Sequence, residues 1–310
     1  MPCPPAPNAK LSLDEILPRL RCPWSGGALE RRADVLVSAD GSAAYPLTDE
    51  IPDLRVPPAR LRIDLPWYEP WEELDALRFE PPAPLPAADL PYHLDAHQAA
   101  VAGAAGDGRW ILEVGCGERR SEAYFAARGF RYVGVDVDRR GIGPHLLADA
   151  HNLPFTDASF DLYVSLAVYE HLASPLLAAL EARRLLAPGG LFFGSAAFMY
   201  GFHDRASFHH MSHAGLLWTL RSAGFRDVRI WPDWSYTDSI SQWGFRGRAG
   251  LPWRAFARGA LTFAEWSFTR SSNLVRRLAG KRPLDLAARR TEIAGSLSFA
   301  ARNPGPGEPH

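Results

Sequence analysis

Cysteine is scarce in this sequence: 310 residues contain three, Cys3, Cys22 and Cys116. An odd, scattered set argues against a disulfide framework and for a reducing compartment. Long hydrophobic runs are also missing, because no stretch of about 18 uninterrupted apolar residues predicts a spanning helix. The N-terminal MPCPPAPNAK lacks the apolar segment of a secretory signal. These absences predict a cytoplasmic protein.

An excess of charge of either sign is absent as well. Lysine and arginine total 34 against 35 aspartate and glutamate, so the net charge is -1. No global field would attract nucleic acid or anionic lipid. What is present is ordinary, since 47% hydrophobic and 22% charged residues are typical of a globular protein. The length suits one large domain or two modest ones.

Proline and glycine divide the first third of the chain. Residues 1–10 are rich in proline and expected to be disordered. Residues 11–56 form a compact block, in which Asp40-Gly41 between apolar pairs predicts a small hairpin. Residues 57–91 contain nine prolines. Proline lacks an N–H and fixes φ, so this stretch is expected to be an extended linker with one short helix at 70–79.

Strand and helix patterns alternate from residue 92 to residue 302. This alternation predicts βαβ units and a mainly parallel sheet in an α/β fold. A turn is expected at 188–190, a long helical insert at 251–282 and a loose tail at 303–310. The expected strands are 110–114, 132–136, 145–147, 160–166, 191–195, 228–231 and 296–301, and the expected helices are 94–105, 121–128, 175–186 and 214–223.

The first of these strands runs into the turn ILEVGCGERR, residues 111–120. Gly115 and Gly117 let the backbone come close to a ligand, and the following helix N-terminus offers N–H groups to a carboxylate or phosphate. The next strand ends at Asp136, whose carboxylate can accept from two ribose hydroxyls. A dinucleotide site is disfavoured because Arg120 stands where G-x-G-x-x-G has its last glycine.

Residues 110 to about 231 resemble the class I S-adenosylmethionine-dependent methyltransferases of type 11. The resemblance rests on ILEVGCG, YVGVDVD, LLADAHNLPFTDASFDLYVSLAVYEHL and EARRLLAPGGLFFGS. The third stretch is the most specific, and the G-x-G alone is weak. The resemblance implies a Rossmann-like methyltransferase sheet with flanking helices, and S-adenosyl-L-methionine as the cofactor.

The same resemblance implies cofactor contacts around the glycine turn. Glu113 and the backbone of Gly115, Cys116 and Gly117 would face the methionine part of the cofactor. Asp136 would bind its ribose. The methionine end and the ribose would therefore be held by residues from two neighbouring strand ends.

Further contacts follow from the third stretch. Asp149 would accept from the adenine amine, with Ala150 beside it, and Leu166 and Ala167 would border the sulfonium. The family often has another glycine at the position of Arg119. The arginine could point outward harmlessly, crowd the methionine carboxylate or pair with it, and the sequence leaves these alternatives open.

The block at 16–55 resembles the small zinc-ribbon-like domains of the Trm112/YcaR type, on ILPRLRCPWSGGALE and AAYPLTDEIPDL. That family usually offers two cysteine pairs, whereas here the first retains Cys22 and the second reads Ser38-Ala39-Asp40-Gly41. A structural zinc site needs four ligands. We therefore expect a small β-rich module without zinc, with Trp24 in its core, docked on the larger domain. It would be a substrate-side or partner-side cap, or a vestigial packing module.

Candidate catalytic residues follow the fourth and fifth expected strands. Methyl transfer from a sulfonium is an in-line displacement that mainly needs a positioned nucleophile, and a base helps if the acceptor is a hydroxyl or ammonium. His203 is the first candidate for that base and His171 the second. Solvated loop histidines and a structural helix start are the alternatives.

Four of the ten histidines lie between Met199 and Leu216. Their spacing matches no metal-ligand pattern, and Asp204 is the one carboxylate among them, so no metal is expected. The four are His203, His209, His210 and His213.

The insert at 251–282 is basic and amphipathic, with seven lysines and arginines against Glu265. Three interpretations compete: a lid over the pocket, which we favour, a membrane-surface helix, or a nucleic-acid patch. The last is weak because no wider basic face accompanies it. The insert is thus a candidate for a peripheral membrane or partner contact.

The expected function is methylation of a small-molecule acceptor, a metabolite or a sugar-bearing compound. An RNA-directed methyltransferase, prompted by the ribbon-like module, is one alternative. A non-catalytic partner protein that retains the fold is the other.

Overall fold

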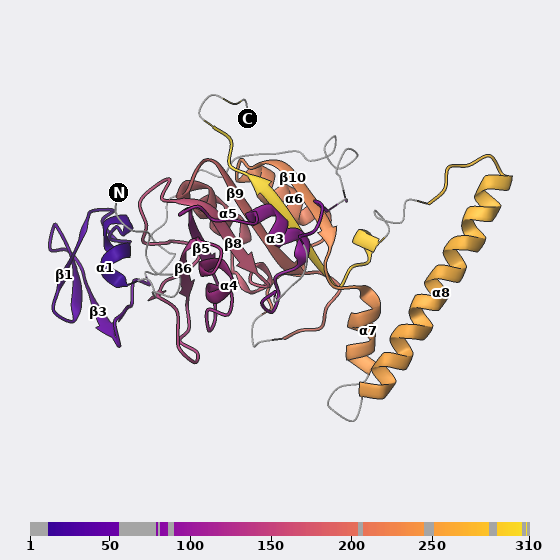
Figure 1. Cartoon of the computed structure of the whole chain (residues 1–310), viewed down its shortest axis with the longest axis horizontal. Coiled ribbons are helices and arrows are strands. Elements are labelled where there is room, and N and C mark those ends of the chain that lie inside the picture. Colours follow the sequence, from indigo (N-terminus) through magenta and orange to yellow (C-terminus); the bar gives the residue numbers. More distant parts are fainter. Residues whose placement is uncertain are drawn as a thin grey trace.

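The computed structural model describes residues 12–55, 79, 81–85, 90–203, 207–244, 251–284, 290–305 and 308. The expected disorder at 1–10, most of the 57–91 linker and its 70–79 helix, and Asp204 lie outside the described residues. Two sheets form, one of four strands near the N-terminus and one of seven strands in the centre (Figure 1).

The central sheet has the order β10-β11-β9-β8-β5-β6-β7. Its four neighbouring pairs from β9 to β7 are parallel, and β11 runs antiparallel between β9 and β10. This arrangement confirms the predicted Rossmann-like α/β fold. The strands are β5 (Trp110–Val114), β6 (Arg131–Asp136), β7 (Leu146–Leu147), β8 (Phe160–Leu166), β9 (Leu186–Ala197), β10 (Arg226–Pro232) and β11 (Ser296–Arg302).

Helices cover the sheet, and most of them match the expected helices but are shorter. The first, expected at 94–105, shows the reason: Asp95 Oδ1 accepts the N–H groups of His97 and Gln98 as an N-cap, and Gly103 ends the helix at φ +95°. The helix α7 was not expected. The elements are α3 (Ala96–Ala102), α4 (Glu122–Ala126), η3 (Tyr169–His171), α5 (Pro175–Leu185), α6 (His213–Ser222), α7 (Tyr236–Gly244) and α8 (Leu251–Leu278).

The start of β9 bends where the sequence predicted a turn at 188–190. Phe160 of β8 pairs with Leu186 and Leu162 with Leu191, so the residues of β9 between them bulge out of the pairing, and Gly189 takes φ +80° there. The Gly189 N–H donates to the Asn303 carbonyl at 2.9 Å, and the Asn303 side chain donates to the Leu186 carbonyl at 2.8 Å. Asn303, expected in the loose tail, is therefore buried, because the bent backbone of β9 needs these partners.

The N-terminal module is an antiparallel sheet preceded by α1 (Leu13–Ile16) and the short helix η1 (Leu17–Arg19). The hairpin predicted at Asp40-Gly41 is confirmed by the pairing of β2 with β3. Trp24 is 44% exposed and does not belong to the core as expected, whereas Cys22 is buried with its Sγ 3.1 Å from the Tyr45 hydroxyl. The strands are β1 (Leu29–Arg32), β2 (Val35–Ser38), β3 (Ala44–Thr48) and β4 (Ile51–Pro52).

The module is docked on the central sheet. Leu36 lies in one continuous apolar cluster with Val133 and Val135 of β6. The Leu54 N–H donates to the Leu147 carbonyl at 2.7 Å, which extends the main sheet's edge into the module. A block of this size gains most of its core by packing on a larger domain.

The helix α8 stands apart from the sheet and packs beside α7 (Figure 1). It does not lie over the β5–α4 turn, so the favoured interpretation as a lid over the cofactor pocket is not what this structure shows. Within the described part of the chain, no helix combines the length and apolarity needed to cross a membrane.

Candidate active site

The turn after β5 leaves open space at one of its two glycines. Gly115 has φ +78°, and a Cβ there would lie 2.2 Å from Val168 Cγ2. Gly117 has φ +52°, and a Cβ there would meet nothing within 4 Å. Both φ values favour glycine. Gly115 thus allows close packing against the segment after β8, while Gly117 presents bare backbone to open space.

Asp136, at the end of β6, is fixed beside this open backbone. The Gly117 N–H donates to Asp136 Oδ2 at 2.8 Å, and the Asp138 N–H donates to Oδ1 at 3.0 Å. Each carboxylate oxygen can accept a second hydrogen bond. The geometry is suited to the predicted contact with two ribose hydroxyls.

Glu113 of β5, which the resemblance placed against the methionine part of the cofactor, is held by side chains from the start of α4 and from β6. It is buried, Ser121 Oγ donates to Oε1 at 3.2 Å, and the Tyr132 hydroxyl donates to Oε2. Burial is the main cause that raises the pKa of Glu113 to about 7, against the opposing effect of these two hydrogen bonds. Its carboxyl group ties the start of α4 to β6. Burial likewise raises the pKa of the Cys116 thiol.

The structure decides among the alternatives for Arg119. The residue has φ +53°, a left-handed backbone that favours glycine, which explains the residue type the family often has there. Its Nε donates to the Gly143 carbonyl at 2.7 Å, and Nη1 lies 3.0 Å from Glu122 Oε2. The side chain is 9% exposed. The guanidinium is held against the 143–145 segment, so it leaves the space at Gly117 free.

Asp149 is held by a residue that the sequence did not single out, His151. Asp149 Oδ1 accepts the His151 N–H at 2.9 Å and lies 2.5 Å from His151 Nδ1. Because His151 Nε2 accepts the Ser174 N–H at 3.1 Å, its proton belongs on Nδ1 and points to Asp149. Burial would raise the pKa of Asp149, but these hydrogen bonds outweigh it and lower the pKa. Ala150 and Leu166, two further predicted cofactor contacts, are both buried.

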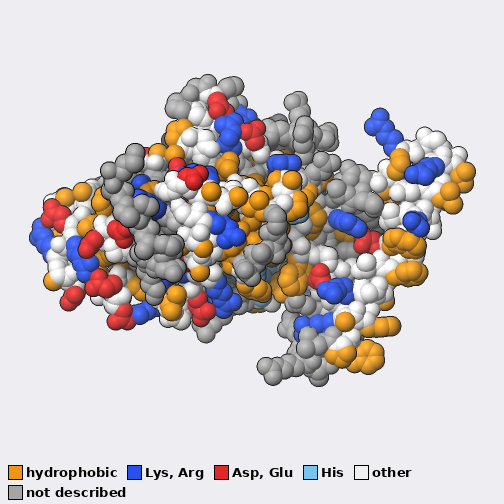
Figure 2. Space-filling view, viewed as in Figure 1, with side chains coloured by type: hydrophobic (Ala, Val, Ile, Leu, Met, Phe, Trp, Pro, Cys, Tyr) orange, Lys and Arg blue, Asp and Glu red, His pale blue; other side chains and the backbone are white. Residues whose placement is uncertain are grey.

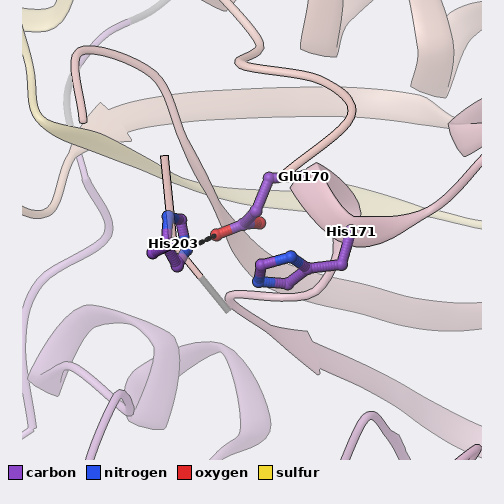
Figure 3. Close-up of side chains that lie close together, drawn as sticks. All are labelled: Glu170, His171 and His203. Carbon is purple, nitrogen blue, oxygen red and sulfur yellow. Dashed lines mark ion pairs between the residues drawn. The ribbon is translucent and has the colours of Figure 1, made fainter. Parts of the chain in front are cut away.

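The two predicted catalytic histidines lie together with Glu170 (Figure 3). His203 Nε2 lies 3.7 Å from Glu170 Oε1, and the rings of His171 and His203 meet edge to face at 4.9 Å. Glu170 is 1% exposed. Its Oε2 has no hydrogen-bond partner among the described residues. We call these three residues the Glu170 cluster. The signal for Glu170 in the sequence was its position directly before His171.

The other loop histidines lie outside the cluster. His210 comes nearest, with its ring 6.4 Å from that of His203, and burial is the main cause that lowers its pKa. His209 Nε2 lies 3.3 Å from the Ala173 carbonyl, and His213 begins α6. His203, the first candidate from the sequence, is thus the residue of this loop that lies in the Glu170 cluster.

A cavity of about 770 Å³ lies elsewhere, between the end of β10, α7 and α8. Asp233 lines it, and burial is the main cause that raises the pKa of this carboxyl to about 6. The residues of the glycine turn do not line this cavity. The size of this cavity does not by itself indicate a reaction. The candidate active site is therefore the one defined by the side chains around the glycine turn and the Glu170 cluster.

Comparison with known families identifies the central region. Residues 112–194 match the family described as methyltransferase domain. Over 119 residues the chain is 35% identical to an uncharacterized methyltransferase of Mycobacterium sp. (strain JLS), covering 34% of this chain and 47% of that protein. A similar protein of Mycobacterium marinum is 31% identical over 160 residues, covering 46% and 63%. The chain spans about half the length of the first curated relatives it matches.

Solved structures give weaker likenesses. Phosphoethanolamine N-methyltransferase 2 of Haemonchus contortus, in complex with S-adenosyl-L-methionine, matches with a TM-score of 0.38 and 16% identity, covering 64% of this chain and 49% of that one. A methyltransferase from Haloferax volcanii in complex with its Trm112 activator matches with a TM-score of 0.43 and 20% identity, covering 64% and 84%. At these values the likenesses add nothing to the geometry.

Proposed function

We propose that this chain, whose residues 112–194 match the family described as methyltransferase domain, is a class I methyltransferase that binds S-adenosyl-L-methionine and methylates a small-molecule acceptor. The observation that supports this most is the arrangement of Asp136 beside Gly117. A carboxylate oriented by two backbone N–H groups adjoins bare backbone and open space. This combination suits a ribose next to an extended amino-acid group.

The proposed contacts follow the strand ends. Asp136 binds the ribose hydroxyls, the Gly115–Gly117 backbone lies along the methionine part, and Leu166 borders the sulfonium. Asp149, kept ionised by His151, accepts from the adenine amine next to Ala150. When bound, the cofactor supplies a methyl group on a sulfonium, with a neutral thioether as the leaving group. The protein then has to position the acceptor in line with that bond.

The Glu170 cluster is the proposed acceptor side of the site. Val168, two residues before Glu170, packs against Gly115, so the cluster adjoins the glycine turn. The sequence suggested His203 as a general base, with His171 second. A base with an oriented carboxylate neighbour is the usual arrangement for taking a proton from a hydroxyl or ammonium.

Calorimetric titration with S-adenosylmethionine and S-adenosylhomocysteine tests cofactor binding. We expect micromolar binding to the wild type and at least about tenfold weaker binding to Asp136→Ala, because charge-assisted hydrogen bonds are lost. Asp138→Ala is the matched control, since Asp138 contributes its backbone N–H to the site. Absence of binding to the folded wild type would refute the proposal and favour a non-catalytic scaffold.

The acceptor class needs a separate measurement. Methyl-labelled cofactor is incubated with the protein and a cell extract, and the label is followed through a filter that retains RNA and protein. Label in the filtrate is expected for a small-molecule acceptor. Label confined to retained RNA would support the RNA-directed alternative instead.

A further inference from the structure

We propose that Glu170, His171 and His203 bind a divalent transition-metal ion. Each offers one ligand atom, and the three atoms lie within 4.8 Å of one another (Figure 3). The Glu170 Oε1 to His203 Nε2 separation of 3.7 Å is too long for a direct hydrogen bond. Two atoms that share a zinc ion with bonds of about 2.0–2.1 Å at a tetrahedral angle lie roughly 3.4 Å apart. Small side-chain rotations would bring the three ligand atoms to the separations that one shared ion requires.

The tautomer of His203 supports a cation at this place. His203 Nδ1 lies 2.9 Å from the Gly201 carbonyl, which can only accept, so the ring proton belongs on Nδ1. The Nε2 lone pair then faces the Glu170 carboxylate. A lone pair facing a carboxylate is repulsive, so either a proton on Nε2 or a metal cation belongs between them, and at 3.7 Å a proton would not form an ordinary hydrogen bond. A backbone carbonyl on the far ring nitrogen is also the usual support of a metal-binding histidine.

Glu170 itself is the second observation. A carboxylate that is 1% exposed, with Oε2 lacking a hydrogen-bond partner among the described residues, is costly to bury. A metal ion would compensate its charge. Two imidazoles and one carboxylate favour zinc or another first-row transition ion over magnesium, and three protein ligands leave a position open.

The open coordination position would let the ion activate the methyl acceptor, a role that rests on the methyltransferase function proposed above. An acceptor hydroxyl held there would lose its proton to solvent more readily. The oxygen lone pair would then form the bond to the methyl carbon as the carbon–sulfur bond breaks and its electron pair leaves on sulfur. His203 would act as a ligand rather than as a free base, so chelation would abolish turnover.

Cobalt(II) titration of the chelator-treated, untagged full chain tests the site without turnover. We expect one ion per chain and the visible absorption of a low-symmetry nitrogen and oxygen site. Affinity should fall at least about tenfold in E170Q and in H203A, because loss even of a supporting group costs that much. H209A is the matched control, since the His209 side chain lies outside the cluster. Thermal unfolding shows that each variant is folded.

Two results would overturn the metal proposal: no stoichiometric cobalt or zinc binding, or equal binding by wild type, E170Q and H203A. Titration with S-adenosylhomocysteine in the same samples separates the two proposals. Cofactor binding without metal binding would leave the methyltransferase proposal standing and return His203 to the role of base. Metal binding without cofactor binding would leave the metal proposal standing and refute the methyltransferase proposal.

A second inference concerns α8, whose apolar face points away from the protein. Trp253, Phe256, Phe263, Leu274 and Leu278 recur at helical spacing, and Phe256 and Leu278 are 70% and 81% exposed. Figure 2 shows hydrophobic side chains along the outer side of this helix. An exposed stripe of this kind marks an interaction surface.

The opposite face of α8 is polar and is the less exposed one. Glu265, Thr269, Ser272 and Arg276 lie four, three and four residues apart, and each is partly or fully buried. Helices on globular proteins normally bury the apolar face. Here the polar face is the more shielded one, where α8 packs beside α7, although Arg258 on that face is 62% exposed, and the aromatic face is left uncovered.

The charges of α8 point to an anionic membrane surface as the occupant of the apolar face. Of the five arginines of the helix, Arg270 and Arg277 are exposed and lie nearest the apolar stripe by helical spacing, and Lys281 and Arg282 follow the helix closely. Aromatic side chains flanked by arginine are the features of helices that lie in the lipid interface. The negative headgroups of acidic phospholipid would complement these positive side chains.

Co-sedimentation of the full chain with lipid vesicles tests this. We expect binding to phosphatidylcholine vesicles that contain phosphatidylglycerol, weaker binding to phosphatidylcholine alone, and a loss on added salt. The variant F256S/F263S/L274S should bind at least about tenfold more weakly, because apolar area no longer enters the lipid. The control W24S/V137S/I142S removes exposed apolar residues elsewhere and should bind normally.

Analytical ultracentrifugation of the same proteins identifies the competing occupant. A dimer that F256S/F263S/L274S dissociates, in a protein that does not bind vesicles, would overturn the membrane proposal in favour of a second copy of the chain. Equal vesicle binding by the wild type and that variant would also overturn it.

Discussion

Two helices of this protein, α5 and α8, use apolar residues in opposite ways. In α5 the side chains of Leu176, Ala182 and Leu185 are buried against the sheet. In α8 the large apolar side chains are exposed and the polar face is covered. An amphipathic pattern therefore defines two faces of a helix but not which of them the protein buries. Matched substitutions in the sheet domain and in α8 should therefore have different effects.

Leucine truncation should separate the two regions most. Leu185→Ala removes a fully buried side chain and should lower the free energy of unfolding by about 3 kcal/mol, because a cavity remains. Leu274→Ala, at a 60% exposed position, should change it by less than about 0.5 kcal/mol. Denaturant unfolding followed by tryptophan fluorescence measures both. Equal losses would show that the stripe on α8 is covered in solution.

Neutralising the carboxyl group of Glu113 should have the next largest effect on the free energy of unfolding, and this effect should depend on pH. The pKa of Glu113 is raised from 4.5 to about 7 in the folded state. The folded protein thus binds this proton more tightly, and the resulting stability is fully present below pH 4.5 and lost as the pH rises through about 7.

Glu113→Gln should remove this dependence. Relative to wild type, the variant should gain up to about 3 kcal/mol of unfolding free energy between pH 5 and pH 8. Glu265→Gln in α8 is the counterpart and should show no comparable gain. Urea unfolding across this pH range gives both curves. A constant difference between Glu113→Gln and wild type would show that the folded protein does not release this proton between pH 5 and pH 8.

Glycine substitution should act with opposite signs in the two regions. Gly115→Ala places a Cβ against Val168 at φ +78° and should cost about 2 kcal/mol, with loss of cofactor binding. Gly259→Ala lies within α8, where a Cβ meets nothing within 4 Å, and should stabilise by up to about 1 kcal/mol. Thermal unfolding and calorimetric titration report the two effects. A harmless Gly115→Ala would contradict the packing described for the turn.

Arginine truncation should give the smallest contrast. Arg119→Ala loses its contacts with Gly143 and Glu122 and should cost about 1 kcal/mol, while affinity for S-adenosylhomocysteine changes less than about threefold. Arg270→Ala, whose guanidinium lies 4.5 Å above the Trp266 ring, should cost under about 0.5 kcal/mol. A large loss of cofactor affinity in Arg119→Ala would show that this arginine reaches the methionine carboxylate after all.

Much of the sheet was predictable because its signals are local. Trp110–Val114 and Phe160–Leu166 are apolar runs bounded by turn residues, and both strands occur where the sequence predicted them. Pro188-Gly189-Gly190 predicted the bend at the start of β9 but not its partner Asn303, which is more than a hundred residues away. The same reason hid the burial of the expected tail.

The candidate site shows the same division. The glycine turn and Asp136 stand out in the sequence because their backbone requirements restrict residue type. The sequence marked Glu170 only by its position directly before His171, and its place beside His203 depends on β8 and β9 pairing and bringing together the segments that follow them. His151 was missed since its contact with Asp149 depends on Ser174 fixing its tautomer.

The sequence by itself determined most of the order of strands and helices, the glycine turn and the methyltransferase resemblance, because each rests on residues close together in the chain. The tertiary structure decided where the Arg119 side chain goes, which carboxylate joins the two histidines, and which face of α8 is left exposed. These outcomes depend on contacts between distant segments, and the pattern of one segment does not encode what packs against it.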